Sequence, residues 1–509
     1  MRIFKHQHNK FLAKLIFILS GIAATVWFLI RVIPKPQRAT YPCMQASAPL
    51  MSAFVLYLLS LSGSVLLFKK FYEHMIQRKF MYAGLIFVFV LISVSLSLNL
   101  GSENVKANDV TLNVLVSNAP SGEARGIFPG RVAWIYKPGV ATWDEVKGNW
   151  WDDANISESG VVQMLSSTLL SVSGTKDETQ AWDAIFKYFN QTKRKLNQGY
   201  SKNEKIAIKI NVNNTYSHEN TNELNASPQM VCALLNSLVN KGGVPQESIT
   251  VFDASRFITN NVFDKCHKAF PEVNYVDNIG GEGRTKSTYT EKAIPYSVDN
   301  GKLAQGLANC AIEANYLINV ALLKGHVGQG VTLCAKNYYG ATNIFNDWRL
   351  NAHNNFDQDK QGNPKYMTFV DFLGHKDLGE KTMLFLIDGL LGSKNVNGPP
   401  TPKWKMEPFN NNWACSLFGS LDGVAIDAVG LDFLRNEWPD APDMKYSEMY
   451  LTEAARADNP PSKTVYDPER DGVKCKSLGV YEHWNNPKDK KYSRNLKSGK
   501  GIELLSVKL

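Results

Sequence analysis

The chain has 509 residues, of which 44% are apolar, and a formal net charge of +9. Residues 1–99 hold eleven lysines and arginines and one acid, so this segment has a charge of +10 and the rest of the chain a charge of −1, which gives no indication of a nucleic-acid-binding face. The seven cysteines lie at least 24 residues apart, which excludes Cys-x-x-Cys metal motifs and ferredoxin runs.

Three apolar stretches open the chain, at about 15–33, 50–68 and 81–99. Each is close to the roughly 20 residues that a helix needs to cross a bilayer, and the sequence therefore predicts a membrane anchor over 1–99 whose partner is lipid. Basic residues at the N-terminus and in the 69–80 loop favour the cytoplasmic side for both. We expect a multi-pass protein of the cytoplasmic membrane with its soluble domain on the outer, periplasmic side.

The first loop of this anchor contains Pro42 and Cys43 close to Arg38. A thiol beside a cation can be reactive, but a proline-stiffened hairpin between two spans has the same composition. The role of this loop and the pairing of any disulfides stay open.

From Thr111 onwards, short β-branched runs alternate with amphipathic helical stretches, which predicts an α/β domain with a mostly parallel sheet. We expect an N-terminal part at 100–200, a core at 201–440 and a C-terminal extension at 441–509 packed on the core. The expected strands are 131–136, 205–212, 248–253, 316–324, 383–388 and 502–507, and the expected helices are 159–171, 178–196, 227–241 and 422–438.

The passage from Lys205 to Asp253 predicts a strand–helix–strand unit. Ser227 followed by Pro228 is a typical start for the intervening helix. Because parallel strands end at the same edge of a sheet, we expect Asn211 and Asp253 to lie at neighbouring carboxyl ends, where open α/β sheets bind their ligands.

A set of short motifs occurs in a characteristic order: Lys209-Ile210-Asn211, Asp253-Ala254-Ser255, Leu323-Lys324-Gly325-His326, the run from Cys334 to Gly340 that contains Lys336 and Asn337, Asp388-Gly389, and the run from Asp422 to Asp427. Together, over about 205–438, they resemble the bacterial and archaeal family called domain of unknown function 362. The resemblance implies a fold and a set of polar residues but no reaction. Some relatives carry a ferredoxin module; this chain lacks clustered cysteines, so no iron–sulfur cluster is expected.

Three of these motif residues are cations, namely Lys209, Lys324 and Lys336, and each follows or ends a predicted strand. Ammonium groups beside glycine-rich backbone can replace the hydration of a phosphate or carboxylate. Three solvated lysines would be the ordinary alternative. The sequence thus predicts a small anionic ligand, held also by Asn211, Asp253, Asn337 and Asp388.

Histidines and carboxylates suggest a second possibility, a divalent metal bound by His326, His353 and Asp388. His375, Asp371, Asp422 and Asp427 lie near them in the sequence, but no short ligand spacing such as His-Glu-x-x-His supports the site. Asp422 is the expected N-cap of its helix. Asp427, among apolar neighbours, needs a partner, for which a lysine or a metal would serve.

Three hypotheses follow for function. The first is a membrane-tethered enzyme in which His326, Lys324, Lys336 and Asp427 act as catalytic groups or hold the ligand. The second is a non-catalytic module that binds an anion or a metal at the membrane. The third is a structural component of an envelope complex, whose protein partners the sequence does not name.

Overall fold

The computed structural model describes residues 25, 26, 30, 117–344 and 355–509. The chain divides into two compact units, 1–115 and 116–509, of which the second is almost fully described. The predicted membrane spans and the Pro42–Cys43 loop fall outside the described residues, apart from residues 25, 26 and 30. Within the described part, no helix has the length and hydropathy that crossing a membrane requires.

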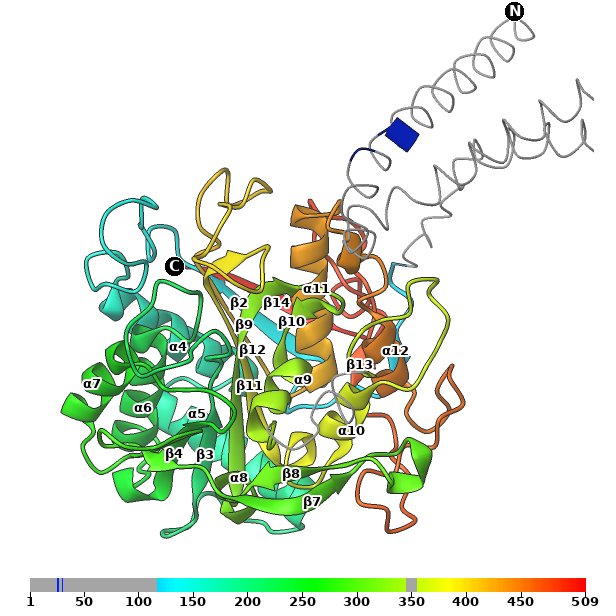
Figure 1. Ribbon diagram of the computed structural model, residues 1–509, viewed down its shortest axis with the longest axis horizontal. Helices are drawn as coiled ribbons and strands as arrows, with labels where there is room; N and C mark the ends of the chain where they lie inside the picture. Colours follow the sequence, from blue (N-terminus) through cyan, green and yellow to red (C-terminus); the bar gives the residue numbers. More distant parts are fainter. Residues whose placement is uncertain (1–24, 27–29, 31–116, 345–354) are drawn as a thin grey trace, which may run out of the picture. The chain divides into compact units, whose positions relative to one another are not determined.

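A mixed, mostly parallel sheet forms the centre of the second unit, as the sequence predicts (Figure 1). Parallel pairs join β11 to β9, β9 to β3, β3 to β4, β4 to β5, and β5 to β6. β12 pairs antiparallel with β11 and β2, and β10 pairs antiparallel with β9. In spatial order the strands are β14 (Glu503–Lys508), β2 (Arg131–Tyr136), β12 (Ser416–Ser420), β11 (Thr382–Ser393), β9 (Tyr316–His326), β3 (Ile206–Lys209), β4 (Ile249–Asp253), β5 (Asn274–Asp277) and β6 (Thr285–Lys286), with β10 (Gly330–Thr332) beside β9.

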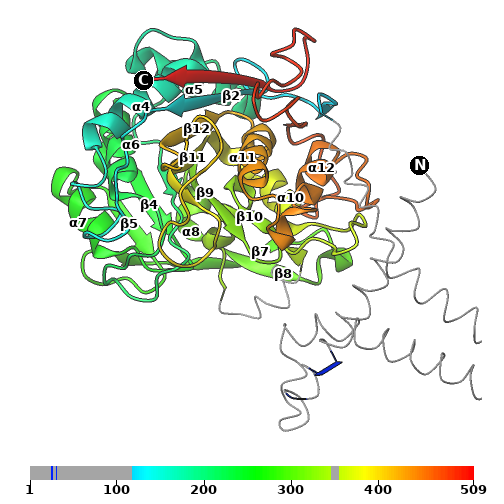
Figure 2. The same ribbon diagram turned by 90° about the horizontal axis from the view of Figure 1, so that it is seen from above.

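Helices cover both faces of this sheet (Figures 1 and 2). On one face lie α4 (Glu158–Ser173), α5 (Glu178–Phe189), α6 (Pro228–Asn240) and α7 (Asn260–Ala269), and on the other α9 (Cys334–Asn337), α10 (Thr368–Gly374), α11 (Gly423–Glu437) and α12 (Met449–Ala455). Two buried apolar clusters, one under each set of helices, separate the layers from water. Smaller elements are α8 (Asn309–Glu313), the β7 (Tyr289–Pro295)–β8 (Ala304–Ala308) hairpin, and the β1 (Ser121–Gly122)–β13 (Val480–Tyr481) pair.

The expected strand–helix–strand unit is present as β3, α6 and β4. The Ser227 hydroxyl accepts a hydrogen bond from the backbone of Met230 and Pro228 opens the helix, which confirms the predicted start of α6. Asp422 caps α11 in the same way, with Oδ1 accepting from the amides of Val424 and Ala425.

The C-terminal segment is part of the sheet itself. β14 pairs in parallel with β2, so residues 503–508 add an edge strand next to one formed by residues 131–136. The extension therefore contributes backbone hydrogen bonds to the central sheet, in addition to covering the core.

Strand order places a switch point between β3 and β9. After β3 the chain builds β4, β5 and β6 outward in one direction, and β9 and β11 later add to the other side of β3. In open α/β sheets, the loops that leave such a point diverge and open a crevice at the carboxyl edge.

Candidate functional site

Lys209 ends β3 at this switch point, and its side chain is completely buried. Its ammonium group donates to Asp253 Oδ2 at 3.0 Å and to Asn337 Oδ1 at 3.1 Å. Asp253, at the end of β4, also accepts from the amide and hydroxyl of Ser255. Burial lowers the pKa of Lys209, and the charge of Asp253 opposes this effect. The pair is fully enclosed and holds two neighbouring strand ends together.

Asn337 connects the two sides of the switch point. Its Nδ2 donates to Asn319 Oδ1 on β9 at 2.8 Å, while its Oδ1 accepts from Lys209 and from Asn211 Nδ2, at 3.1 Å in each case. Lys209 and Asn319 are register partners across β3 and β9. One side chain of α9 thus bridges both strands, and Lys209, Asn211, Asp253 and Asn337 form one hydrogen-bond network.

Asp427 holds α9 in place. Its carboxylate accepts from the amides of Cys334 and Ala335 at 2.8 and 2.9 Å and from the Tyr450 hydroxyl at 3.0 Å. Burial raises the pKa of Asp427 to about 6. Three bonds to protein groups make Asp427 a positioning residue for the segment that carries Lys336 and Asn337.

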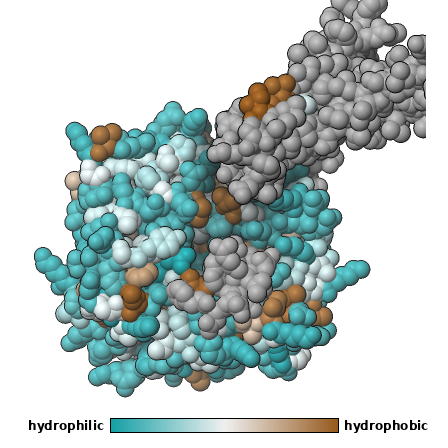
Figure 3. Space-filling view, viewed as in Figure 1, coloured by the Kyte–Doolittle hydropathy of each residue, from teal (hydrophilic) through white to brown (hydrophobic). Residues whose placement is uncertain are grey.

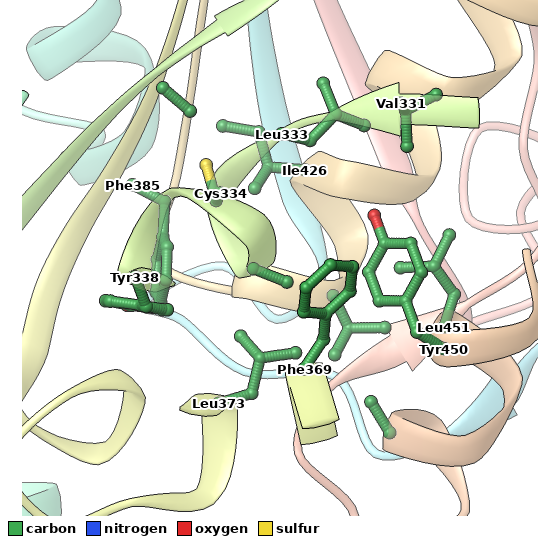
Figure 4. Close-up of a cluster of buried hydrophobic side chains, with 14 of the residues drawn as sticks. Val331, Leu333, Cys334, Tyr338, Phe369, Leu373, Phe385, Ile426, Tyr450 and Leu451 are labelled. Atoms are coloured by element: carbon green, nitrogen blue, oxygen red, sulfur yellow. The ribbon is translucent and has the colours of Figure 1, made fainter. Parts of the chain in front are cut away.

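Apolar packing completes this support. Figure 4 shows Leu333, Cys334 and Tyr338 of the α9 segment within a cluster that includes Ile426 and Tyr450. The Cys334 thiol is buried and donates to the Leu386 carbonyl at 3.7 Å, and burial raises its pKa well above the ordinary value. Cys334 is therefore part of the core that supports α9.

Lys336 differs from Lys209 in having no polar partner among the residues that the structure describes. Its half-buried ammonium group lies 5.8 Å from the ring centre of Tyr339 and 5.2 Å from that of Phe356, and it makes no hydrogen bond or ion pair with any described residue. Burial lowers the pKa of Lys336 to about 8; the charge of Asp357 raises it, and Arg256 and Lys209 lower it further. Lys336 is thus a cation with unused donors in a field that contains other cations.

Lys324, near the end of β9, is completely buried. Its ammonium group donates to Asn213 Oδ1 at 2.8 Å and to the Leu224 carbonyl at 3.1 Å. Burial lowers the pKa of Lys324 to about 7, and Lys336 contributes in the same direction. Lys324 therefore changes its protonation state near neutral pH and responds to the charge on Lys336.

Two further groups extend this region. Arg256 follows β4, and its guanidinium donates to the carbonyls of Asn213 and Ser255, both at 2.9 Å. Asn211 Oδ1 is a buried acceptor with no hydrogen-bond partner among the described residues. Such acceptors are uncommon in folded proteins, and a ligand donor would satisfy this one.

Asp388 lies on a different face from the Lys209 network. Successive residues of a strand point to opposite faces, so Asp388 shares a face with Leu386 and Leu390, two residues away on either side. Both leucines belong to the apolar cluster under α4–α7. Asp388 bonds to Ser227 at the start of α6 and accepts from the amide of Leu390 at 3.0 Å. Burial raises its pKa to about 6. Asp388 thus joins the start of α6 to β11.

His326 lines a cavity of about 290 Å³ together with Lys394, Asn395 and Asp443. Val396, whose carbonyl lies 3.5 Å from the Lys324 ammonium, lines the same cavity. The cavity therefore adjoins Lys324 at the end of β9.

The expected metal site is only partly covered by the structure, because His353 lies outside the described residues. Within the described ranges, no three His, Cys, Asp or Glu side chains gather in a way that could hold a metal ion. His375 is buried against the Ala293 carbonyl at 3.0 Å, and Asp371 accepts from Ser297 and Tyr366. A metal held by His326, His353 and Asp388 stays a prediction.

Three residues of this region were not predicted from the sequence: Asn213, Arg256 and Asn319. Asn319 could have been found, because it is the one polar side chain inside the apolar run 316–323, and a buried amide needs partners. Asn213 and Arg256 lie in loops, where no periodicity separates a site residue from a surface residue.

A protein-family model matches part of this chain. Residues 206–432 match the model of the family described as "Domain of unknown function (DUF362)". No curated protein and no solved structure matches the chain. The matched segment runs from the start of β3 into α11 and includes every residue of the Lys209 network.

Proposed function

Residues 206–432 of this chain belong to the DUF362 family, and on that premise we propose that their carboxyl-edge cluster binds a small anionic ligand, a phosphate or a carboxylate, in a membrane-tethered enzyme. The family description states no activity, so the proposal rests on the chemistry of the site. Its position at the β3–β9 switch point agrees with the place where open α/β sheets bind ligands.

The ammonium group of Lys336 is the observation that carries this proposal. A half-buried cation without a hydrogen-bond partner among the described residues is costly, since desolvation is not offset by a bond. An anion would supply both the counter-charge and the acceptors. Asn211 Oδ1 adds a requirement for a donor, and a ligand that carries a hydroxyl beside its anionic group would meet both needs.

Lys324 supports the catalytic part of the proposal. A group with a pKa of about 7 can both give and take a proton at neutral pH, which is the property a general acid or base needs. Anion binding beside Lys336 would reduce the repulsion between the two cations and raise the pKa of Lys324. Ligand binding and protonation of Lys324 would therefore be coupled.

A thermal-shift screen of the full chain in detergent tests the binding part. Inorganic phosphate, pyrophosphate, citrate and malonate serve as probes, with Lys336→Met as the variant and the exposed Lys302→Met as its control. We expect at least one anion, at a large excess over its Kd, to raise the Tm by about 2 °C or more in the parent and control but not in Lys336→Met. Equal shifts in all three proteins would contradict the proposal.

The membrane part of the proposal rests on the sequence alone. Three apolar stretches and their basic flanks favour an anchor in the cytoplasmic membrane, with residues from 100 onwards on the outer side. The site would then meet ligands of the periplasmic space.

A further inference from the structure

A second feature lies at α6 and α7, outside the carboxyl-edge cluster. A groove of about 690 Å³ runs between these helices and the segment around Trp151. Cys232 of α6 lines the groove, and Lys265 of α7 lies on its wall. The groove thus borders a residue that carries a thiol and is 7% exposed.

A second thiol lies directly behind the first. Cys266 of α7 is completely buried and hydrogen-bonds to the Cys232 side chain. Its Sγ also lies 3.8 Å from the carbonyl oxygen of Pro228, one helical turn before Cys232. Cys334 and Cys415 point instead at the backbone carbonyls of Leu386 and Ala141. Contact between two thiols on adjacent helices is the arrangement from which a disulfide forms.

The two thiols are not equivalent. The hydrogen bond from Cys266 lowers the pKa of Cys232, and the charge of Lys265 acts in the same direction. Burial raises the pKa of Cys266 well above its ordinary value. A thiolate is the attacking species in disulfide exchange, so Cys232 reacts first and Cys266 second.

We propose that Cys232 and Cys266 form a reversible disulfide between α6 and α7 by exchange with a low-molecular-weight disulfide that enters the groove. Cys232 Sγ attacks one sulfur of that disulfide, forms a mixed disulfide and releases the first small thiolate. Cys266 then gives its proton to solvent, and its sulfur attacks Cys232 Sγ and displaces the second small thiol. Two cysteine thiols are oxidised and one external disulfide is reduced to two thiols.

The Cys232–Cys266 disulfide would stabilise the two helices that follow the loops of the candidate site. α6 follows the loop that carries Asn211 and Asn213, and α7 follows the loop that carries Arg256. A covalent link closing the roughly 35 residues from Cys232 to Cys266 reduces the conformational freedom of the unfolded chain and so stabilises this part of the fold.

The test uses the full chain in detergent, first reduced and then incubated with oxidised glutathione without oxygen. Acid quenching, alkylation of free thiols, proteolysis and mass spectrometry identify the products. We expect a peptide pair linked through Cys232 and Cys266, two fewer alkylated cysteines, and reversal by dithiothreitol. Oxidation should raise the Tm by roughly 3–6 °C.

Variants separate the two steps. Cys266→Ala should stop at a glutathione mixed disulfide on Cys232, Cys232→Ser should give neither product, and the control Cys310→Ser should form the linked pair as the parent does. Peptide mapping of the parent protein shows whether the Cys232–Cys266 disulfide forms, even where a variant fails to fold. A parent in which both thiols remain alkylated, or in which the mixed disulfide on Cys232 persists, would overturn the proposal.

Discussion

Lys209 and Lys336 belong to the same ordered set of motifs, yet their surroundings differ. Lys209 is enclosed with Asp253 and Asn337 as partners, while the ammonium of Lys336 lies over two aromatic rings and bonds to no described residue. The first lysine therefore stabilises the fold and the second is available to a ligand. Sequence alone does not distinguish them, because both are lysines that follow strands.

The structural role of Lys209 predicts a large loss of stability in Lys209→Met. Removing the cation leaves the Asp253 carboxylate buried without its counter-charge, which costs about 3–5 kcal/mol of unfolding free energy. Urea denaturation followed by circular dichroism measures this loss. The exposed Lys302→Met should change the unfolding free energy by less than about 0.5 kcal/mol. A loss of that small size in Lys209→Met would contradict the role given to the pair.

The pKa of Lys336 predicts how anion affinity depends on pH. With a pKa of about 8 in the free protein, Lys336 is half deprotonated at that pH and largely neutral one unit above it. Above pH 8 the affinity should therefore fall by up to about tenfold per pH unit. Lys336→Arg keeps its charge throughout and should show a flatter profile. Titration with sulfate, whose own charge is constant over pH 7–10, measures both profiles. Identical pH profiles of the parent and Lys336→Arg would show that Lys336 does not bind the anion.

At the scale of elements, the predicted strands follow from simple patterns. The runs at 131–136, 248–253 and 316–324 are apolar and β-branched, and the structure has β2, β4 and β9 there. β9 and β11 extend beyond their predicted ends, to His326 and Ser393, because pairing with neighbours continues past the apolar run.

α9 was not predicted, and its surroundings explain why. A helix of four residues has no periodicity to detect, and it exists because Asp427, ninety residues later, accepts two of its amides. Similarly, the assignment of Asp427 as a catalytic group came from its apolar neighbours. The sequence indicates that Asp427 needs a partner, and the structure shows that its partners are two backbone amides and the Tyr450 hydroxyl.

Asp427→Ala should therefore weaken α9 as a unit. Two buried amides and one hydroxyl would lose their acceptor, at a cost of about 3 kcal/mol or more. We expect faster hydrogen exchange at Cys334 and Ala335, together with a weaker thermal response to anions. Asp427→Asn retains one acceptor oxygen and should show a smaller effect in both measurements. Unchanged exchange in Asp427→Ala would contradict the positioning role.

At the scale of the whole molecule, the sequence predicts the α/β class. It does not predict that the expected site residues lie on two opposite faces of the sheet. Strand alternation places Lys209 toward α9 and Asp388 toward α6, on opposite faces of one sheet. The sequence shows that both residues follow or end apolar strands. Which face each one takes depends on register, and register is fixed by pairs such as Lys209 with Asn319, far apart along the chain.

The predicted anchor is also a property of the whole chain. Full-length protein should sediment with membranes, resist extraction by high salt or alkaline carbonate, and dissolve in detergent. A chain that lacks 1–99 should appear in the soluble fraction. Impermeant thiol or amine reagents applied to intact cells should label residues after 100. Extraction of the full chain by salt alone would contradict the anchor.

Affinity labelling with methyl acetyl phosphate, an anionic acylating reagent, tests the central claim most directly. Peptide mapping of the full chain near pH 8 gives the extent of acetylation at Lys336 and at the control Lys302. The account predicts that Lys336 is labelled faster than Lys302, and that the anion with the largest thermal shift protects Lys336 alone. Labelling of Lys336 no faster than that of Lys302, or equally fast with and without the anion, would show that the carboxyl edge is not an anion site.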